Sequence, residues 1–353
     1  MKVCSNCVNN SSVRKISFDK ENVCNYCKDL KKIESKLNDY KHLEKLFTER
    51  IDKIRGKYTY DVAVGISGGK DSIYVLYELI NKYHLHVKAF TMNNGFLNDE
   101  AKKNIDKIVK EFGIEHEYIE FDKEILKKFY RYSMKKWLVP CIACSYIGYA
   151  AMINYTSKIN AGICIHGRSP EQMLRYYGND IFTVLIEAGL KSIEDINISE
   201  LYTELLEGIE NKVDKNLMQD VKHMLFQDMK ENDFREFVSY FLYHKYSEKE
   251  IVDFLQKNTS WSVENNYNHY DCLIHNATRY IYQCAEGRPH SMPEVSVLVR
   301  SKNITKAEAE NRMKQEIISK KPKEELDMLC DFVNLNQNLI LLKAKIYNKV
   351  IRK

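Results

Sequence analysis

The segment Ser67-Gly-Gly-Lys-Asp-Ser72 combines residue types that bind phosphate. Its two glycines let the main chain approach an anion closely, and its serine hydroxyls add hydrogen-bond donors. Residues 62–66, an apolar run typical of a buried strand, precede it, and residues 72–83, with apolar side chains at helical spacing, follow it. A glycine turn between a strand and a helix presents backbone N–H groups to an anion. We therefore predict a phosphate-binding loop, although its spacing differs from the P-loop and the dinucleotide fingerprint.

Two pairs of cysteines near the N-terminus have the spacing of a metal site. Cys4 and Cys7 form one C-x-x-C pair, and Cys24 and Cys27 form a second pair sixteen residues later. Four thiolates complete the tetrahedral coordination of Zn²⁺ and leave no position open for a substrate. The spacing therefore predicts a structural zinc ribbon.

A third C-x-x-C pair, Cys141 and Cys144, lies in the middle of the chain. It is compatible with half of a second zinc site, with a redox pair, with part of a [4Fe–4S] cluster, or with packed free thiols. A cluster would need a third cysteine from farther along the chain. The residues available for that role are Cys284, Cys272 and, less well placed, Cys164 and Cys330.

Strand and helix patterns alternate around the predicted loop. They fall at residues 86–91 (strand), 98–112 (helix), 115–121 (strand), 123–137 (helix) and 161–165 (strand). This alternation indicates an α/β fold with a parallel sheet and helices on both faces. Because ligands bind at the carboxyl ends of parallel strands, we expect the loop and residues 166–171, which include Gly167, to line one crevice.

The chain divides into regions of different pattern. We predict a zinc ribbon at 1–32, connecting helices at 33–57, an ATP-binding α/β domain at 58–178 and a mainly helical domain at 179–353. In the last region, Thr305 and Glu308 have the spacing of a capping box that opens a helix.

Composition favours a cytosolic protein and permits an anionic substrate. No apolar run reaches the length of a membrane span, and Met1-Lys-Val-Cys4 does not begin a signal peptide. Ten cysteines, partly in C-x-x-C pairs, indicate metal or redox chemistry in such a compartment. A net charge of +5 suits an anionic ligand without requiring nucleic acid.

The loop resembles the PP-loop, SGGxDS, of ATP pyrophosphatases, which cleave ATP between its α and β phosphates and adenylate a carbonyl oxygen. The resemblance implies that the triphosphate of ATP lies over Ser67, Gly68, Gly69, Lys70, Asp71 and Ser72. It also implies an adenine site at the end of the second strand, beside Thr91, Asn93 and Asn94, with Gly167 on the facing segment.

The same resemblance implies how catalysis proceeds. Asp71 is the carboxylate expected to hold Mg²⁺ on the phosphates, and Lys70 is expected to add a positive charge or to face solvent. With Ser67 and the backbone N–H groups of the turn, these side chains would stabilise the departing pyrophosphate. Such a reaction needs no protein nucleophile, because it depends on positioning and electrostatics.

Several further segments resemble the N-acetyl sugar amidotransferases of surface-glycan biosynthesis. They are Cys4 with Cys7, Ile16-Ser-Phe-Asp19, Val23-Cys-Asn-Tyr-Cys27, Ser67–Ser72 and, more loosely, Tyr270-Asp-Cys272, Gly287-Arg288 and Val299-Arg-Ser-Lys-Asn-Ile-Thr305 with Glu308. The resemblance implies adenylation of an acetamido oxygen on an N-acetylated or nucleotide-linked sugar. Ammonia from a separate glutaminase subunit would then convert that group to an amidine.

Two departures from this pattern leave the transferred atom open. Cys141 and Cys144 resemble the cluster-binding element of tRNA thiolation enzymes, and Cys284 lies close to Gly287-Arg288. An alternative is therefore an ATP-dependent sulfurtransferase that acts on tRNA or on a small molecule and uses an iron–sulfur cluster. A second alternative, a non-catalytic nucleotide-binding module, is less compatible with an intact Asp71 and Ser72.

Overall fold

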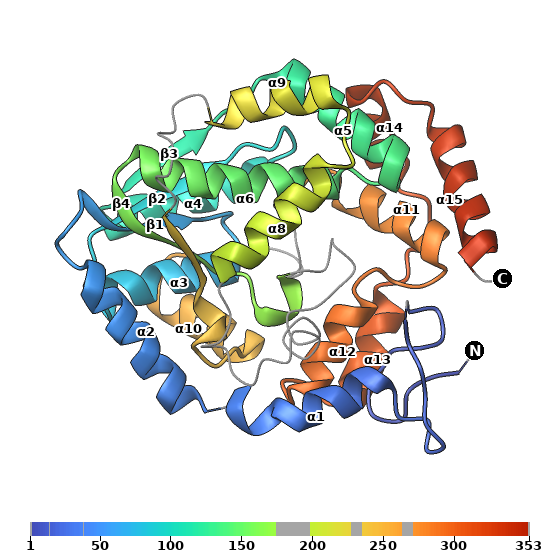
Figure 1. Cartoon of the computed structure of the whole chain (residues 1–353), viewed down its shortest axis with the longest axis horizontal. Helices are drawn as coiled ribbons and strands as arrows, with labels where there is room; N and C mark the ends of the chain where they lie inside the picture. The colour runs from blue at the N-terminus through green and yellow to red at the C-terminus, as the bar shows by residue number, and fades with distance from the viewer. Residues whose placement is uncertain are drawn as a thin grey trace.

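Five parallel strands form one sheet within the described residues (Figure 1). The structure, a computed structural model, describes residues 2–13, 15–37, 39–173, 198–226, 235–262 and 271–351. Across the sheet the strands are β3 (Glu115–Ile119), β2 (Val87–Met92), β1 (Tyr60–Gly65), β4 (Ala161–His166) and β5 (Glu236–Ser239). All pairings are parallel, which confirms the α/β fold class that the sequence predicts.

The strand order creates a switch point beside β1. From β1 the chain moves outward to β2 and β3, and then returns to place β4 on the opposite side of β1. Because crossovers between parallel strands are right-handed, connections that run in opposite directions lie on opposite faces of the sheet. The carboxyl ends of β1 and β4 therefore border a crevice of the kind in which ligands bind.

The helices predicted beside the sheet are present. The chain forms α3 (Lys70–Asn81) after β1, α4 (Asp99–Phe112) after β2, and α5 (Lys123–Trp137) after β3. The side chain of Asn98 caps α4 by accepting hydrogen bonds from the N–H groups of Glu100 and Ala101. The predicted connecting helices are α1 (Asn25–Leu37) and α2 (Tyr40–Ile54), so α1 begins inside the region predicted as the ribbon.

Two elements lie where the sequence analysis does not place them. Helix α6 (Cys141–Lys158) is buried over most of its surface, so it lacks the polar face that marks a helix in a sequence. Strand β5 lies in the region predicted as mainly helical, and it has only four residues. It pairs with β4, so the sheet takes strands from both sides of the predicted division at residue 178.

A short helix, η1 (Pro170–Gln172), follows β4. Beyond residue 178, the other described elements are helical, as predicted: α8 (Ile198–Glu210), α9 (Lys215–Phe226), the short helix η4 (Tyr240–Leu242), α10 (Glu248–Asn258), α11 (His275–Glu286), α12 (Met292–Arg300), α13 (Lys306–Gln315), α14 (Lys323–Phe332) and α15 (Gln337–Ile351). The capping box of Thr305 and Glu308 opens α13. Among the described residues, no helix is both long and apolar enough to cross a membrane.

Candidate active site and metal centre

The predicted phosphate-binding loop connects β1 to the N-terminus of α3. Gly68 has a φ of 79°, and a Cβ atom there would meet the carbonyl oxygen of Ala101 at 2.8 Å, so this position requires glycine. Gly69 is the N-cap residue of α3. The Ser72 hydroxyl closes the loop, because it accepts from the Ser67 N–H (3.2 Å) and donates to the Gly69 carbonyl (3.0 Å). The first N–H groups of α3 have no acceptor inside the helix and are suited to an anion.

Two distant segments contact this loop. Gly167, which follows β4, packs so closely that a Cβ atom would lie 2.8 Å from the Asp71 carbonyl oxygen. The indole N–H of Trp261 donates to the Gly68 carbonyl at 3.0 Å. The loop therefore packs between Gly167 at the end of β4 and Trp261, which follows the loop by nearly two hundred residues.

Lys70 and Asp71 form a buried ion pair at the start of α3. The Lys70 Nζ lies 3.0 Å from Asp71 Oδ2 and 3.6 Å from Glu248 Oε1. Burial acts against the charge of Lys70, but the two carboxylates raise its pKa. Burial also raises the pKa of Asp71, against the effect of Lys70. Lys70 therefore does not face solvent. The sequence analysis had left that position open as an alternative to a positive charge on the phosphates.

The second oxygen of Asp71 is the unusual atom of this pair. Asp71 Oδ1 is buried, and in the part of the chain that the structure describes it has no hydrogen-bond partner. A buried carboxylate oxygen without a donor is costly unless a cation or a ligand completes its environment. The residue thus fits the magnesium-binding role that the sequence predicts.

Further acidic residues gather around Asp71. The Tyr246 hydroxyl interacts with Asp71, and burial together with the charges of Asp71, Glu171, Glu248 and Glu294 raises the pKa of Tyr246. Burial raises the pKa of Glu171 to about 8, with contributions from Glu294 and Asp71. The sequence analysis placed Glu171 at this crevice but did not identify Tyr246, Glu248 or Glu294, because these residues belong to no local motif.

The residues predicted beside the adenine have defined contacts of their own. The buried Thr91 hydroxyl donates to the Ile66 carbonyl at 2.8 Å and contacts His116, so it joins β1 to β2. The amide of Asn93 donates to the Glu120 carboxylate at 2.9 Å. Asn94 accepts from the Phe96 N–H at 2.9 Å. All of them lie at the carboxyl edge of the sheet, as predicted, and their role toward adenine stays a prediction.

On the α6 side of the crevice, three cysteines lie within electrostatic reach of each other. Cys141 and Cys144 begin α6, and the Asn94 amide donates to Cys144 Sγ at 3.7 Å. Burial, the charge of Asp271, and the thiols of Cys144 and Cys141 all raise the pKa of Cys272. Cys272 is therefore the residue that the structure brings to the C-x-x-C pair.

Cys284, the other residue that the sequence analysis named as a possible third ligand, lies elsewhere. Its thiol contacts Tyr280, and the nearby charge is that of Lys345. The physical reason is α11, which begins after Cys272 and carries Cys284 about 15 Å along its axis. Among the described residues, the one group of three or more metal-ligating side chains is Cys4, Cys7, Cys24 and Cys27, so Cys141, Cys144 and Cys272 do not form a preformed site. Cys164 and Cys330 are buried in other parts of the fold.

His166, at the end of β4, is a buried neutral hydrogen-bond donor that the sequence analysis did not single out. Its Nδ1 accepts from the Arg168 N–H at 3.1 Å, which places the ring proton on Nε2. Burial, and then the charge of Arg168, hold its pKa well below the usual range. Nε2 has no partner in the described residues, so its N–H is a buried donor without an acceptor there.

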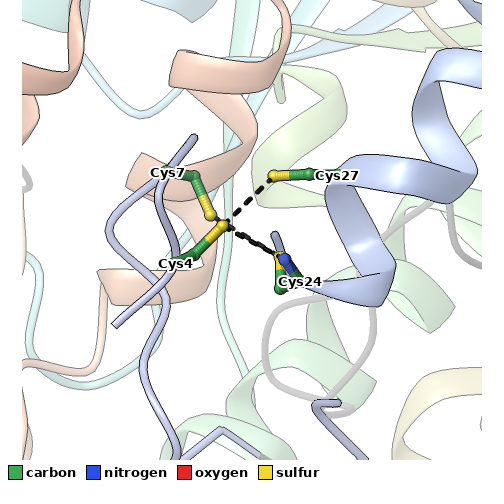
Figure 2. Close-up of side chains that lie close together, drawn as sticks. All are labelled: Cys4, Cys7, Cys24 and Cys27. Atoms are coloured by element: carbon green, nitrogen blue, oxygen red, sulfur yellow. Dashed lines mark hydrogen bonds between the residues drawn. The ribbon is translucent and has the colours of Figure 1, made fainter. Parts of the chain in front are cut away.

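The four N-terminal cysteines lie together, as predicted, in a group that could hold a metal ion (Figure 2). All four Sγ atoms lie within 4.8 Å of one another, and the Cys4–Cys27 and Cys7–Cys24 pairs are each 3.8 Å apart. Four sulfurs held about 2.3 Å from one tetrahedral Zn²⁺ would be about 3.8 Å apart. The thiolates of a [4Fe–4S] cluster each bind a different iron and are spaced more widely, so the geometry fits a single zinc ion.

The surroundings of this centre show the features of a structural site. The N–H groups of Asn6 and Cys24 donate to Cys4 Sγ at 3.4 and 3.3 Å. Hydrogen bonds from Cys24 and Cys27 lower the pKa of Cys7. Cys4, Cys7 and Cys24 are fully buried and Cys27 is half-buried, as expected of a closed site.

The N-terminal segment with the four cysteines packs against α12 and α13, which lie near the C-terminus in sequence. Lys306 donates to the carbonyls of Cys4 and Ser5, each at 3.0 Å, and Ser296 donates to Asn9 at 2.9 Å. Val8 packs with apolar side chains of α12 and α13. Because α12 in turn packs against η1, which carries Glu171, the metal centre is linked through α12 to the crevice.

Comparisons with known proteins reveal only distant similarity. No protein-family model matches the chain, and no curated protein matches it either. Among solved structures, the U34-tRNA thiolase NcsA from Methanococcus maripaludis, solved with its [4Fe–4S] cluster, has a TM-score of 0.38 and 16% identity over 96% of this chain and 88% of its own.

Two synthetases have comparable scores. The NH3-dependent NAD synthetase from Campylobacter jejuni has a TM-score of 0.30 and 15% identity, over 54% of this chain and 94% of its own. The NMN synthetase from Francisella tularensis has a TM-score of 0.32 and 13% identity, over 84% and 93%. Because these scores are low, the resemblance to N-acetyl sugar amidotransferases stays a prediction, and function must be argued from the residues of the site.

Proposed function

We propose that the chain binds ATP over Ser67–Ser72 and transfers AMP to an oxygen of its substrate, with release of pyrophosphate. One observation carries the proposal. A buried carboxylate oxygen, Asp71 Oδ1, lacks a donor in the described residues and belongs to the first turn of a helix that follows a glycine loop. Backbone donors for phosphate and a free oxygen for a cation thus occur side by side.

The chemistry follows from these groups. A substrate oxygen attacks the α-phosphorus, the bond from that phosphorus to the bridging oxygen breaks, and pyrophosphate leaves with the bonding electrons. The N–H groups that begin α3 stabilise the charge that develops on pyrophosphate. Lys70 is held in place by Asp71 and Glu248, so its charge is already positioned before ATP arrives.

Magnesium fits this site. Asp71 would hold the ion through the oxygen that lacks a partner in the described residues. Bound there, Mg²⁺ would neutralise charge on the phosphates. Glu171 and Glu294 are buried nearby, but among the described residues no group of three carboxylates is close enough to form a preformed metal cage. ATP itself would therefore supply further oxygen ligands.

For the second step we propose nitrogen transfer to an acetamido group, in line with the segments that resemble N-acetyl sugar amidotransferases. Ammonia adds to the activated carbon, AMP leaves with the electrons of the carbon–oxygen bond, and an amidine forms. The neutral His166 N–H would hold an oxygen of the activated group without adding charge. A separate glutaminase subunit would supply the ammonia.

Sulfur transfer is a second candidate, because Cys272 joins Cys141 and Cys144 at the same crevice. These three cysteines would hold a [4Fe–4S] cluster, and such a cluster would supply the sulfide that attacks the adenylated carbon in place of ammonia. The substrate would then be a carbonyl of tRNA or of a small molecule. In both candidates AMP is the leaving group, so the two differ only in the nucleophile.

The first experiment tests the adenylation step. Wild-type protein, incubated with Mg–ATP and candidate N-acetylated sugar nucleotides, should release AMP and pyrophosphate. Asp71→Asn should lower that rate at least a hundredfold, which is the usual cost of a lost preorganised group. Asp99→Asn, an exposed carboxylate at the start of α4, is the matched control and should keep the wild-type rate. Release of ADP and phosphate, or ATP binding without turnover, would contradict the proposal.

The second experiment separates nitrogen from sulfur transfer. Protein purified without oxygen should be colourless and contain one zinc per chain if ammonia is the nucleophile. Sulfur transfer requires a brown protein whose iron is lost in Cys272→Ser and kept in Cys284→Ser, since only Cys272 lies beside the C-x-x-C pair. Iron that depends on Cys284 would contradict the arrangement of thiols described above.

A further inference from the structure

Helix α15 has two apolar faces, and only one of them is covered. Ile340 and Ala344 are buried on the side that packs against α11, where the Asn348 amide donates to the Cys284 carbonyl at 3.1 Å. On the other side, Leu339, Leu342, Ile346 and Val350 are 62%, 54%, 52% and 67% exposed. The helix lies at the edge of the molecule, beside α11 and α14 (Figure 1).

The exposed side chains form a stripe with the period of a helical seam. Leu339, Leu342 and Ile346 are spaced by three and four residues, the a–d–a pattern of a heptad, and Val350 adds one further turn. Among the described residues, α15 carries more exposed large apolar side chains than any other helix. A contiguous apolar stripe on a firmly anchored helix marks an interaction site.

Charge restricts the kind of partner. Lys343, Lys345 and Lys349 are exposed beside the stripe, and residues 337–351 contain no aspartate or glutamate. In the heptad numbering, Lys343 and Lys345 occupy the e and g positions, which face the flanking residues of a partner helix, and Lys349 takes the next d position, so the apolar a–d–a seam ends at Ile346. A second copy of α15 would oppose lysine to lysine in either orientation, so self-association through this stripe is unfavourable.

The composition of the helix favours a protein partner over a membrane surface. Helices that lie in a bilayer interface insert a broad apolar face, often with tryptophan or phenylalanine. On α15, Ile340 and Ala344 are buried against α11, and residues 337–351 contain neither tryptophan nor phenylalanine. Tyr347, 38% exposed beside the stripe, is the one aromatic side chain of this helix.

We propose that the exposed stripe of α15 docks an amphipathic helix of a partner protein, with apolar residues in its seam and glutamate or aspartate beside it. The partner would bury Leu339, Leu342, Ile346 and Val350 and pair its carboxylates with Lys343 and Lys345. This surface is independent of the proposed catalytic function, because it lies on a helix that contributes no residue to the crevice.

The test uses the full-length protein and a synthetic heptad peptide with leucine at a and d and glutamate at e and g. Binding is measured by fluorescence anisotropy. The acidic peptide should bind, and the same peptide with lysine at e and g should not. The double variant Lys343→Glu/Lys345→Glu should weaken binding of the acidic peptide on the order of tenfold and permit binding of the basic one. High salt should reduce that preference for the acidic peptide.

Variants in the stripe provide the second arm. Leu342→Ser/Ile346→Ser should abolish binding while leaving thermal stability unchanged, since both side chains are more than half exposed. Ile317→Ser removes an equally exposed apolar side chain outside α15 and should bind normally. Equal binding of both peptides, binding that survives the stripe variant, self-association lost in that variant, or binding to anionic phosphatidylglycerol vesicles instead would each overturn the proposal.

Discussion

At the scale of single residues, the crevice contains more carboxylates than a phosphate site ordinarily tolerates. Asp71, Glu171, Glu248 and Glu294 all act on Tyr246, and Lys70 lies within 4 Å of two of them. A triphosphate can enter such an environment only if cations accompany it or carboxyl groups are protonated. The raised pKa values of Asp71 and Glu171 follow from this crowding and from burial.

Glu171 provides a prediction about pH at this scale. Its pKa is about 8 in the folded protein and near 4.5 when unfolded, so the folded state retains a proton that the unfolded state loses. Stability should therefore fall as pH rises from about 5 to about 8 and level off above that. The groups that act on or are affected by this carboxyl are Asp71, Glu294, Tyr246 and Tyr40.

Urea unfolding at several pH values tests this prediction. Glu171→Gln keeps a neutral side chain of the same shape at every pH, so its stability should decline less between pH 6 and 8.5 than that of the wild type. Glu124→Gln, at an exposed position on α5, should follow the wild-type curve. Parallel curves for Glu171→Gln and wild type would show that Glu171 is ionised in the folded protein.

At the scale of elements, the turn between β1 and α3 depends on one glycine. Gly68→Ala adds a left-handed backbone penalty of about 1 kcal/mol and a clash with the Ala101 carbonyl. Gly113, at the end of α4, has a similar φ of 62° but open space around it. Gly113→Ala should thus cost only the backbone penalty, whereas Gly68→Ala should cost more and also abolish ATP binding. Calorimetry of unfolding and of ATP binding measures both, and equal losses would refute a steric role.

The N-terminal ribbon is the second element with a testable role. Cys24→Ser should remove zinc and lower the melting temperature by roughly 5 to 10 °C, because the metal holds the segment that packs on α12 and α13. Cys284→Ser, outside both cysteine groups, should change neither zinc content nor melting. A Cys24→Ser protein without zinc that melts like the wild type would rule out a structural metal.

At the scale of the whole molecule, the C-terminal half closes the site that the N-terminal half begins. Trp261 donates to the Gly68 carbonyl, Tyr246 and Glu248 contact the Lys70–Asp71 pair, and β5 completes the sheet. The crevice is therefore assembled only when the two halves pack together.

The hydrogen bond from Trp261 to the loop should allow tryptophan fluorescence to report nucleotide binding. The chain has two tryptophans, so Trp137→Phe leaves Trp261 as the sole one. Because its indole N–H contacts the phosphate-binding loop, ATP should change its fluorescence, with a midpoint equal to the calorimetric Kd. Trp261→Phe retains Trp137, at the end of α5, and should show no response. A silent Trp261 in protein that binds ATP would place the nucleotide elsewhere.

The sequence alone determined the local features of this protein. The turn at Ser67–Ser72, the two N-terminal cysteine pairs, the alternation of strands and helices, and the capping box at Thr305 were all predicted and are present. Each depends on residues within a few positions of one another, where backbone geometry and side-chain spacing impose the structure directly.

Tertiary structure alone decided what surrounds those features. Helix α6 has no amphipathic pattern because it is buried. Strand β5 is too short for its sequence to predict a strand, and it forms by pairing with β4. Cys272, rather than Cys284, reaches Cys141 and Cys144 because α11 carries Cys284 away from them. Tyr246, Glu248 and Glu294 join Asp71 from positions far along the chain, and such contacts arise from packing, which no local spacing encodes.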